Sequence, residues 1–222
     1  MKQHQGVWFP DHEQHLLDWM TKNGEIVDGR GTYQIKKLRA AIAHCRSFRR
    51  AVDVGAHIGL WSMQLAKRFQ WVAAFEPVAA HRECLYANIP GAEGDGNSNV
   101  SVYQCALGDH EGTVQIETLP SSSGDSRVAL DAPGEIPLHM LDQFQLRDVD
   151  FIKLDCEGYE LFALKGGAQT IARDLPVICV EQKPGRAQRF GLPELGAVEW
   201  LIKQFGYRCV EKMSGDYVMV PG

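Results

Sequence analysis

The chain has 222 residues, of which 45% are hydrophobic and 23% are charged, the composition of an ordinary globular domain. At this length one compact domain is the simplest organisation, and intrinsic disorder, a small disulfide scaffold and a collagen-like structure are excluded. The formal net charge of −5 disfavours binding to nucleic acid or to an anionic membrane surface.

The spacing of the cysteines and the composition of the N-terminus indicate the cellular compartment. The six cysteines are dispersed and form no Cys-x-x-Cys pair, so neither a zinc site nor a disulfide framework is expected. The first residues lack an apolar signal region, and no apolar run reaches the roughly 18 residues that a membrane span needs. We therefore predict a cytoplasmic protein without a membrane partner.

The first part of the chain, residues 1–49, is predicted to be a helical extension. Asp11 and Gln14 resemble a capping box, which indicates a helix over residues 11–22. Apolar residues at helical spacing predict a second helix over residues 35–45. We expect this extension to pack beside a core formed by residues 50–222, within a single domain spanning 1–222.

From residue 50 onward, short apolar runs alternate with helical stretches. The predicted main strands are 51–54, 71–75, 100–107, 151–154 and 177–180, followed by the pair 207–212 and 216–220. The predicted helices cover 59–69, 79–89, one stretch with Leu161, Leu164, Ala168 and Ile171 on its core face, and 195–205. Extra strands over 113–119 and 136–141 surround a polar loop at 120–125. This alternation favours a parallel sheet with helices on both faces, closed by an antiparallel pair.

Two strand ends carry residues suited to an adenosine-containing ligand. The first strand ends in Asp53-Val54-Gly55-Ala56-His57-Ile58-Gly59, whose glycines permit a sharp turn into a helix with free N–H groups. The second ends in Glu76-Pro77, and a carboxylate at this position can accept hydrogen bonds from ribose hydroxyls.

His57 decides between a dinucleotide and S-adenosylmethionine. It occupies the place of the second glycine of the dinucleotide motif, where a side chain obstructs the approach of a diphosphate. S-Adenosylmethionine has no phosphate. The amides between Gly55 and Gly59 could receive its carboxylate, and Asp53 could accept from its ammonium group.

The motifs together resemble the FkbM-type methyltransferases. The resemblance rests on the Asp53–Gly59 turn, Ala74-Phe75-Glu76-Pro77, Ala106-Leu107-Gly108-Asp109, Ile152-Lys153-Leu154-Asp155-Cys156-Glu157-Gly158-Tyr159-Glu160, Leu164-Lys165-Gly166-Gly167 and Asp216-Tyr217-Val218-Met219-Val220-Pro221. It runs from about residue 51 to the end, and members usually carry Asn at the position of His57. It implies an α/β class I methyltransferase (Rossmann-like) sheet of order 3-2-1-4-5-7-6 with an antiparallel last strand, S-adenosylmethionine as methyl donor, and O-methylation, often of a sugar hydroxyl.

Carried over to these positions, the resemblance also implies the cofactor site. Asp53, Gly55 and Gly59 would hold the methionine end, Glu76 the ribose, and Ala106 and Leu107 the adenine. His57 and Pro77 belong to the same two motifs and are counted with the cofactor-binding residues.

Carboxylates at the ends of the fourth and fifth strands are the catalytic candidates. Asp155 and Glu157 stand where the fourth strand meets its helix, and Glu181 ends the fifth, whereas Glu160 suits helix capping. Asp155, Glu181 and Gln182 could also hold Mg²⁺, an arrangement similar to the Asp and Asp-Asn ligands of catechol O-methyltransferase. Without a metal, Asp155 or Glu157 would act as the base.

The predicted function is S-adenosylmethionine-dependent O-methylation of a hydroxyl on a saccharide or a glycosylated small molecule. Nucleic-acid methylation is disfavoured by the negative charge and by the absence of an Asp-or-Asn-Pro-Pro-aromatic element after the fourth strand. An NAD-dependent oxidoreductase and a non-catalytic nucleotide- or S-adenosylmethionine-binding module are the alternatives.

Overall fold

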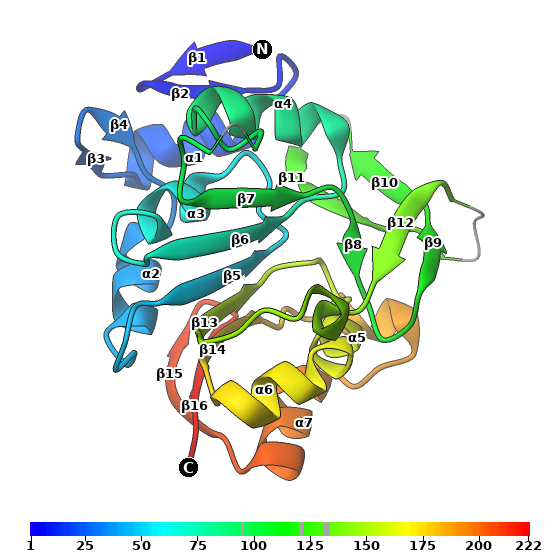
Figure 1. Ribbon diagram of the computed structural model, residues 1–222. Helices are drawn as coiled ribbons and strands as arrows, with labels where there is room; N and C mark the ends of the chain where they lie inside the picture. The colour runs from blue at the N-terminus through cyan, green and yellow to red at the C-terminus, as the bar shows by residue number, and fades with distance from the viewer. Residues whose placement is uncertain (95, 120–121, 131–133) are drawn as a thin grey trace.

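The computed structural model describes residues 1–94, 96–119, 122–130 and 134–222, and a seven-stranded sheet forms its centre (Figure 1). The strands of this sheet are β5 (Arg50–Val54), β6 (Trp71–Phe75), β7 (Val100–Tyr103), β13 (Val149–Leu154), β14 (Val177–Glu181), β15 (Arg208–Met213) and β16 (Asp216–Val220). They lie in the order β7-β6-β5-β13-β14-β16-β15, which is 3-2-1-4-5-7-6 when the seven strands are numbered along the chain. β16 is antiparallel to both neighbours. The predicted class I α/β fold is confirmed.

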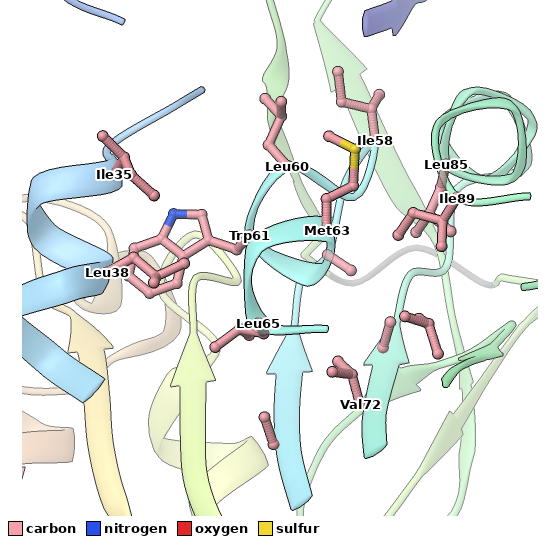
Figure 2. Close-up of a cluster of buried hydrophobic side chains, with 14 of the residues drawn as sticks. Ile35, Leu38, Ile58, Leu60, Trp61, Met63, Leu65, Val72, Leu85 and Ile89 are labelled. Atoms are coloured by element: carbon pink, nitrogen blue, oxygen red, sulfur yellow. The ribbon is translucent and has the colours of Figure 1, made fainter. Parts of the chain in front are cut away.

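Helices cover both faces of the sheet, as the continuous apolar runs of its central strands require. One buried cluster packs α1 (His15–Asn23), α2 (Ile35–Ile42), α3 (Leu60–Leu65) and α4 (Ala79–Asn88) on one face. Figure 2 shows part of it, with Trp61 of α3 beside Ile35 and Leu38 of α2. The second cluster packs η1 (Leu141–Phe144), α5 (Glu160–Gly166), α6 (Ala168–Asp174) and α7 (Gly196–Phe205) on the other face. Among the described residues, no helix is long and apolar enough to span a bilayer.

The helix predicted around Leu161–Ile171 is two helices, α5 and α6, which meet at Gly167. Two contacts explain the break. A Cβ at Gly166 would lie 1.9 Å from the carbonyl oxygen of Gly108, so the chain passes that backbone at close range. The Asp142 carboxylate accepts the N–H groups of Gln169 and Thr170, at 2.9 Å each, and thereby caps the start of α6.

The third predicted strand is also interrupted. β7 ends at Tyr103, and β8 (Ala106–Leu107) pairs instead with β12 (Ile136–His139), which pairs with β9 (Gly112–Val114) in a separate small sheet beyond the end of the main one (Figure 1). The chain therefore leaves the main sheet at the point where Ala106 and Leu107 are predicted to border adenine.

The polar segment 120–125 is a strand in the part that the structure describes. β11 (Ser122–Val128) pairs antiparallel with β10 (Ile116–Leu119), and the remaining residues 120–121 lie outside the described ranges. For residues 122–125 the expected loop is therefore corrected to a strand. Its serines and aspartate carry no hydrophobic alternation from which a strand could have been predicted.

The N-terminal segment, defined as residues 1–49, contains two hairpins besides its helices. β1 (Lys2–His4) pairs with β2 (Val7–Phe9), and β3 (Ile26–Val27) pairs with β4 (Arg30–Gly31). Both turns have two successive residues of positive φ, a geometry that Asp28-Gly29 suits. The two predicted helices are present as α1 and α2, but the prediction of a helical extension missed these two hairpins.

The start of α1 differs from the predicted capping box. The helix begins at His15, where the Oε1 of Glu13 accepts the N–H of Leu16 at 2.7 Å. Asp11 instead accepts from the N-terminal ammonium group at 3.0 Å. An ion pair between Lys37 of α2 and Asp216 of β16 attaches the N-terminal segment to the sheet.

Candidate active site

A cleft lies at the carboxyl ends of the central strands, where α/β sheets bind their ligands. Its empty volume is about 1260 Å³, counted to its open mouth. The predicted site residues that line it are Gly55, His57, Glu76, Pro77, Ala106, Leu107, Asp155, Glu157 and Glu181. The β10–β11 hairpin and the N-terminal segment supply other walls.

Gly55 belongs to the glycine turn, which is defined as residues 53–59, and packs closely against the end of β13. Its φ is +75°, and an added Cβ would lie 2.0 Å from the carbonyl oxygen of Asp155. No other residue fits there without displacing that backbone. The turn and the first catalytic candidate are therefore held side by side in the cleft.

Glu76 organises the turn from β6. Its Oε2 accepts the N–H of His57 at 2.7 Å, and its Oε1 accepts the N–H of Val78 at 2.9 Å and lies 3.2 Å from Nδ1 of His81. Burial opposes the charge of Glu76, but these contacts and the two histidines together lower its pKa. A carboxylate offers about four acceptor positions, so a position is left for a ligand hydroxyl.

His57 faces the hairpin. Its Nε2 lies 2.8 Å from the hydroxyl of Ser123, and its ring contacts that of His81 edge to face at 4.4 Å between centroids. Burial, followed by the charge of His81, lowers the pKa of His57 to about 3, so the ring is neutral at neutral pH. The φ of +53° explains the residue type, because His and Asn adopt this conformation more readily than most others.

Asp53 and Gly59 lie behind the lining of the cleft. Asp53 is fully buried; its Oδ2 accepts the hydroxyl of Ser62 at 2.6 Å, and its Oδ1 lies 3.5 Å from Nζ of Lys153. Gly59 is the N-cap of α3, with a φ of +84°, and faces Leu85. Both residues support the turn from behind.

Gln182 does not face the cleft, so its prediction as a metal ligand was wrong. Its Oε1 accepts the N–H of Ala197 at the start of α7 at 3.0 Å, and its Nε2 donates to Glu160 at 3.5 Å. β14 ends at Glu181, and the side chain of the next residue, Gln182, points to α7 and away from the cleft.

Asp155, Glu157 and Glu181 form a carboxylate cluster at the floor of the cleft. One oxygen from each lies within 4.8 Å of the others. A φ of +57° at Glu157 turns the chain so that its side chain joins those of the two strand ends. Burial and the nearby charge of Asp155 raise the pKa of Glu157 to about 8 and that of Glu181 to about 9.

Each carboxylate of the cluster has a cationic partner. Nζ of Lys153 lies 3.5 Å from Asp155, Nζ of Lys183 lies 2.7 Å from Glu181, and Arg186 pairs with Glu157. Burial disfavours the charge of Lys153, but Asp155 and Asp53 raise its pKa. Sequence reasoning assigned no role to these cations. Their spacing in the sequence could have indicated the contacts. Lys153 is two positions from Asp155 and Lys183 is two positions from Glu181, and residues two apart in extended chain lie on the same face.

The β10–β11 hairpin is fastened over the cleft at two points. Ser123 bonds to Glu13 of the N-terminal segment and to His57. Asp125 accepts from Arg186 at 2.7 Å, and Arg186 also holds Glu157. The hairpin therefore connects the glycine turn with the carboxylate cluster.

Comparison with known proteins identifies the family. Residues 53–209 match the model of the methyltransferase FkbM domain. The chain belongs to the FkbM methyltransferase family. The match covers the glycine turn, the carboxylate cluster and the hairpin, and the N-terminal segment lies outside it.

Individual relatives of this FkbM-family chain agree with that result. It is 34% identical over 77 residues to the methyltransferase sdnD of Sordaria araneosa, a stretch that covers 34% of this chain and 29% of that protein. A crystal structure of methyltransferase FkbM from Methylobacillus flagellatus matches with a TM-score of 0.53 and 23% identity, over 78% of this chain and 43% of the other. The chain thus spans less than half the length of either protein.

One solved structure matches this chain over nearly its whole length, and the likeness is one of fold. The structure of a putative caffeoyl-CoA O-methyltransferase from Staphylococcus aureus has a TM-score of 0.53 and 14% identity, over 92% of this chain and 89% of the other. At that identity, the likeness shows the class I methyltransferase fold and nothing of the acceptor.

Proposed function

We propose that this chain transfers a methyl group from S-adenosylmethionine to a hydroxyl of a saccharide or of a glycosylated small molecule. The observation that carries the proposal is the position of the carboxylate cluster in the same cleft as the glycine turn and Glu76. A cofactor bound along the turn would thus have proton acceptors beside it.

The residues present fit S-adenosylmethionine. Gly55 lines the cleft in close contact with Asp155, Glu76 keeps an acceptor position for a ribose hydroxyl, and Ala106 and Leu107 add apolar surface for the adenine. His57 fills the place where a dinucleotide would need its diphosphate to approach, which argues against an NAD-dependent enzyme.

In this reaction the protein mainly aligns the acceptor hydroxyl with the methyl group and provides a base. S-Adenosylmethionine supplies a methyl group that is electrophilic because it is bonded to a positively charged sulfur. When the methyl–sulfur bond breaks, its electron pair would stay with the sulfur. The acceptor oxygen forms the new carbon–oxygen bond, and its proton goes to a carboxylate of the cluster. Burial and the charge of Asp155 raise the pKa values of Glu157 and Glu181 to about 8 and about 9. Their ionised form is therefore a stronger base than an ordinary carboxylate, and the fraction present in that form grows as the pH rises above neutral.

Mg²⁺ fits the site poorly. The predicted ligand Gln182 points to α7, and each of the three clustered carboxylates already contacts a lysine or an arginine. A divalent cation would have to displace these partners or lie next to their positive charge. The carboxylate mechanism therefore needs no metal ion.

The first experiment measures cofactor binding. Isothermal titration of the full chain is expected to show saturable binding of S-adenosylmethionine and S-adenosylhomocysteine and none of NAD. Binding of NAD alone would overturn the proposal in favour of an oxidoreductase.

The second experiment measures transfer. Label from methyl-labelled S-adenosylmethionine is followed into a panel of methyl glycosides, with duplex DNA and RNA as acceptors expected to stay unlabelled. An ether product keeps its label in mild alkali, whereas a methyl ester loses it. Glu181→Gln should reduce transfer, and Glu199→Gln, on the exposed start of α7, is the matched control. Cofactor binding without transfer to any glycoside would favour the non-catalytic alternative.

A further inference from the structure

The N-terminal segment forms part of the cleft wall, although it lies outside the matched family domain. Tyr33 lines the same cleft as Asp155 and Glu181, and so does Trp61 of α3. Tyr33 stands between the β3–β4 hairpin and α2.

Tyr33 is fixed in position from several sides. The preceding residue, Thr32, donates its N–H to the carbonyl of Glu25 at 2.9 Å and closes the base of the hairpin. The following residue, Gln34, has a φ of +52°, so the chain turns sharply before α2. The ring of Trp19 contacts the Tyr33 ring edge to face, at 4.7 Å between centroids.

The hydroxyl of Tyr33 faces the charged part of the cleft and has no hydrogen-bond partner among the described residues. Burial, followed by the charge of Asp155, raises the pKa of Tyr33 to about 12, with Lys183 and Glu181 as further neighbours. At neutral pH the hydroxyl keeps its proton and remains a donor for a ligand.

Trp61 provides a second unused donor. Its side chain is 4% exposed, and within the described chain its Nε1 has no hydrogen-bond partner. In Figure 2 the indole nitrogen lies on the edge of the ring that points away from the strands of the sheet. Nζ of Lys153 lies 5.8 Å from the centre of the same ring. A buried N–H without an acceptor is costly, and a ligand oxygen at this place would remove that cost.

The surroundings favour a neutral ligand with several hydroxyl groups. Tyr33 and Trp61 offer donors on one wall, and Asp155 and Glu181 offer acceptors, with Lys153 and Lys183 balancing their charge. A cationic ligand would meet the lysines, and an anionic ligand would meet the carboxylates. A hydroxyl donates and accepts at once and can bond to both walls.

We infer that Tyr33 and Trp61 bind the methyl acceptor, a neutral polyol, by donating hydrogen bonds to its oxygens and turning one hydroxyl toward the carboxylate cluster. This inference rests on the proposed function, because it assigns the acceptor end of the same cleft. Tyr33 of the N-terminal segment and Trp61 of the family domain then select the acceptor together.

The first test uses Tyr33→Phe in the full chain, with Tyr86→Phe as the matched control. Tyr86, on α4, lies outside the cleft lining and is half-buried. With the methyl glycoside that wild type methylates best, Tyr33→Phe is expected to raise the acceptor KM roughly five- to tenfold, the effect of one neutral hydrogen bond. The kcat and the affinity for S-adenosylhomocysteine should stay within about twofold. An acceptor KM equal to that of wild type would overturn the role of Tyr33, and an equal loss of S-adenosylhomocysteine affinity would assign the residue to the cofactor instead.

The second test needs no turnover. The indole N–H resonances of ¹⁵N-labelled protein saturated with S-adenosylhomocysteine are recorded while methyl glycosides are added, and Trp61→Phe identifies the Trp61 resonance. A saturable shift of that resonance in wild type, weakened in Tyr33→Phe, supports the acceptor site even if no transfer is found and the proposed function fails. A Trp61 resonance that none of the glycosides moves would overturn the inference even if transfer occurs.

Discussion

The Oε2 of Glu13 accepts both the backbone N–H of Ser123, at 2.7 Å, and its hydroxyl, although the two residues are 110 positions apart. The Oε1 of the same carboxylate caps α1 through Leu16. Since the Ser123 hydroxyl gives its single proton to Glu13, it must accept from His57, which we therefore assign as the Nε2–H tautomer. One buried carboxylate thus connects the N-terminal helix, the hairpin and the glycine turn.

Ser123→Ala should destabilise the protein. The change removes a donor from a buried carboxylate and an acceptor from His57, and a hydrogen bond to a charged group contributes about 1.5–3 kcal/mol. Urea unfolding measures the difference in the free energy of unfolding. Ser126→Ala, which loses one bond to the carbonyl of Ser123, should cost about 1 kcal/mol or less. Equal losses in the two variants would contradict the importance of the Glu13 contact.

Glu76→Ala should weaken cofactor binding and also lower stability. The variant loses the ribose acceptor, which should reduce the affinity for S-adenosylmethionine roughly 10- to 100-fold. It also leaves the N–H groups of His57 and Val78 without their acceptor, so the urea midpoint should fall as well. Glu83→Gln, at an exposed position of α4, serves as the control. A folded Glu76→Ala protein with unchanged affinity would remove Glu76 from the cofactor site.

The carboxylate cluster should make stability depend on pH. The pKa of Glu181 is about 9 in the folded chain, against an ordinary value of 4.5. Between these values the folded state binds more protons than the unfolded state, so this group's contribution to stability is present near pH 5 and is lost as the pH rises to about 9. Glu181→Gln should flatten that decline, with Tm changing by about 2–4 °C for each kcal/mol. Parallel Tm curves for wild type and variant would contradict the raised pKa.

Removal of divalent metal ions should leave activity intact. Lys153, Lys183 and Arg186 already compensate the three carboxylates, so wild type treated exhaustively with EDTA should retain its full rate of methyl transfer. Titration of the treated protein with MgCl₂ should give no saturable heat. A loss of activity that Mg²⁺ or Mn²⁺ restores would establish the metal mechanism.

The site residues that stand at the ends of strands were predictable from the sequence. Gly55, Glu76 and Asp155 each come directly after an apolar run, and carboxyl ends of parallel strands meet at one edge of a sheet. The side of the strand was predictable too, and the error at Gln182 came from placing two successive residues in one site. In the structure the second of these residues follows the end of β14 and bonds to α7.

The contacts across the cleft were not predictable from the sequence. Glu13, Ser123 and Tyr33 reach the site because of the path of segments that carry no periodic pattern, and their partners are distant in the chain. Arg186 likewise joins Asp125 and Glu157 only because the hairpin folds back over the cleft. Local propensity and hydrophobic patterning contain no information on such pairings.

β16 lies between β14 and β15, although the ribosome makes it after both. Until residues 216–220 emerge, β14 ends in an open edge, β15 lacks its neighbour in the sheet, and Lys37 lacks the carboxylate of Asp216. Open strand edges readily pair with other chains. A nascent chain that stalls before Asp216 would therefore expose two such edges and would be prone to pairing with other chains.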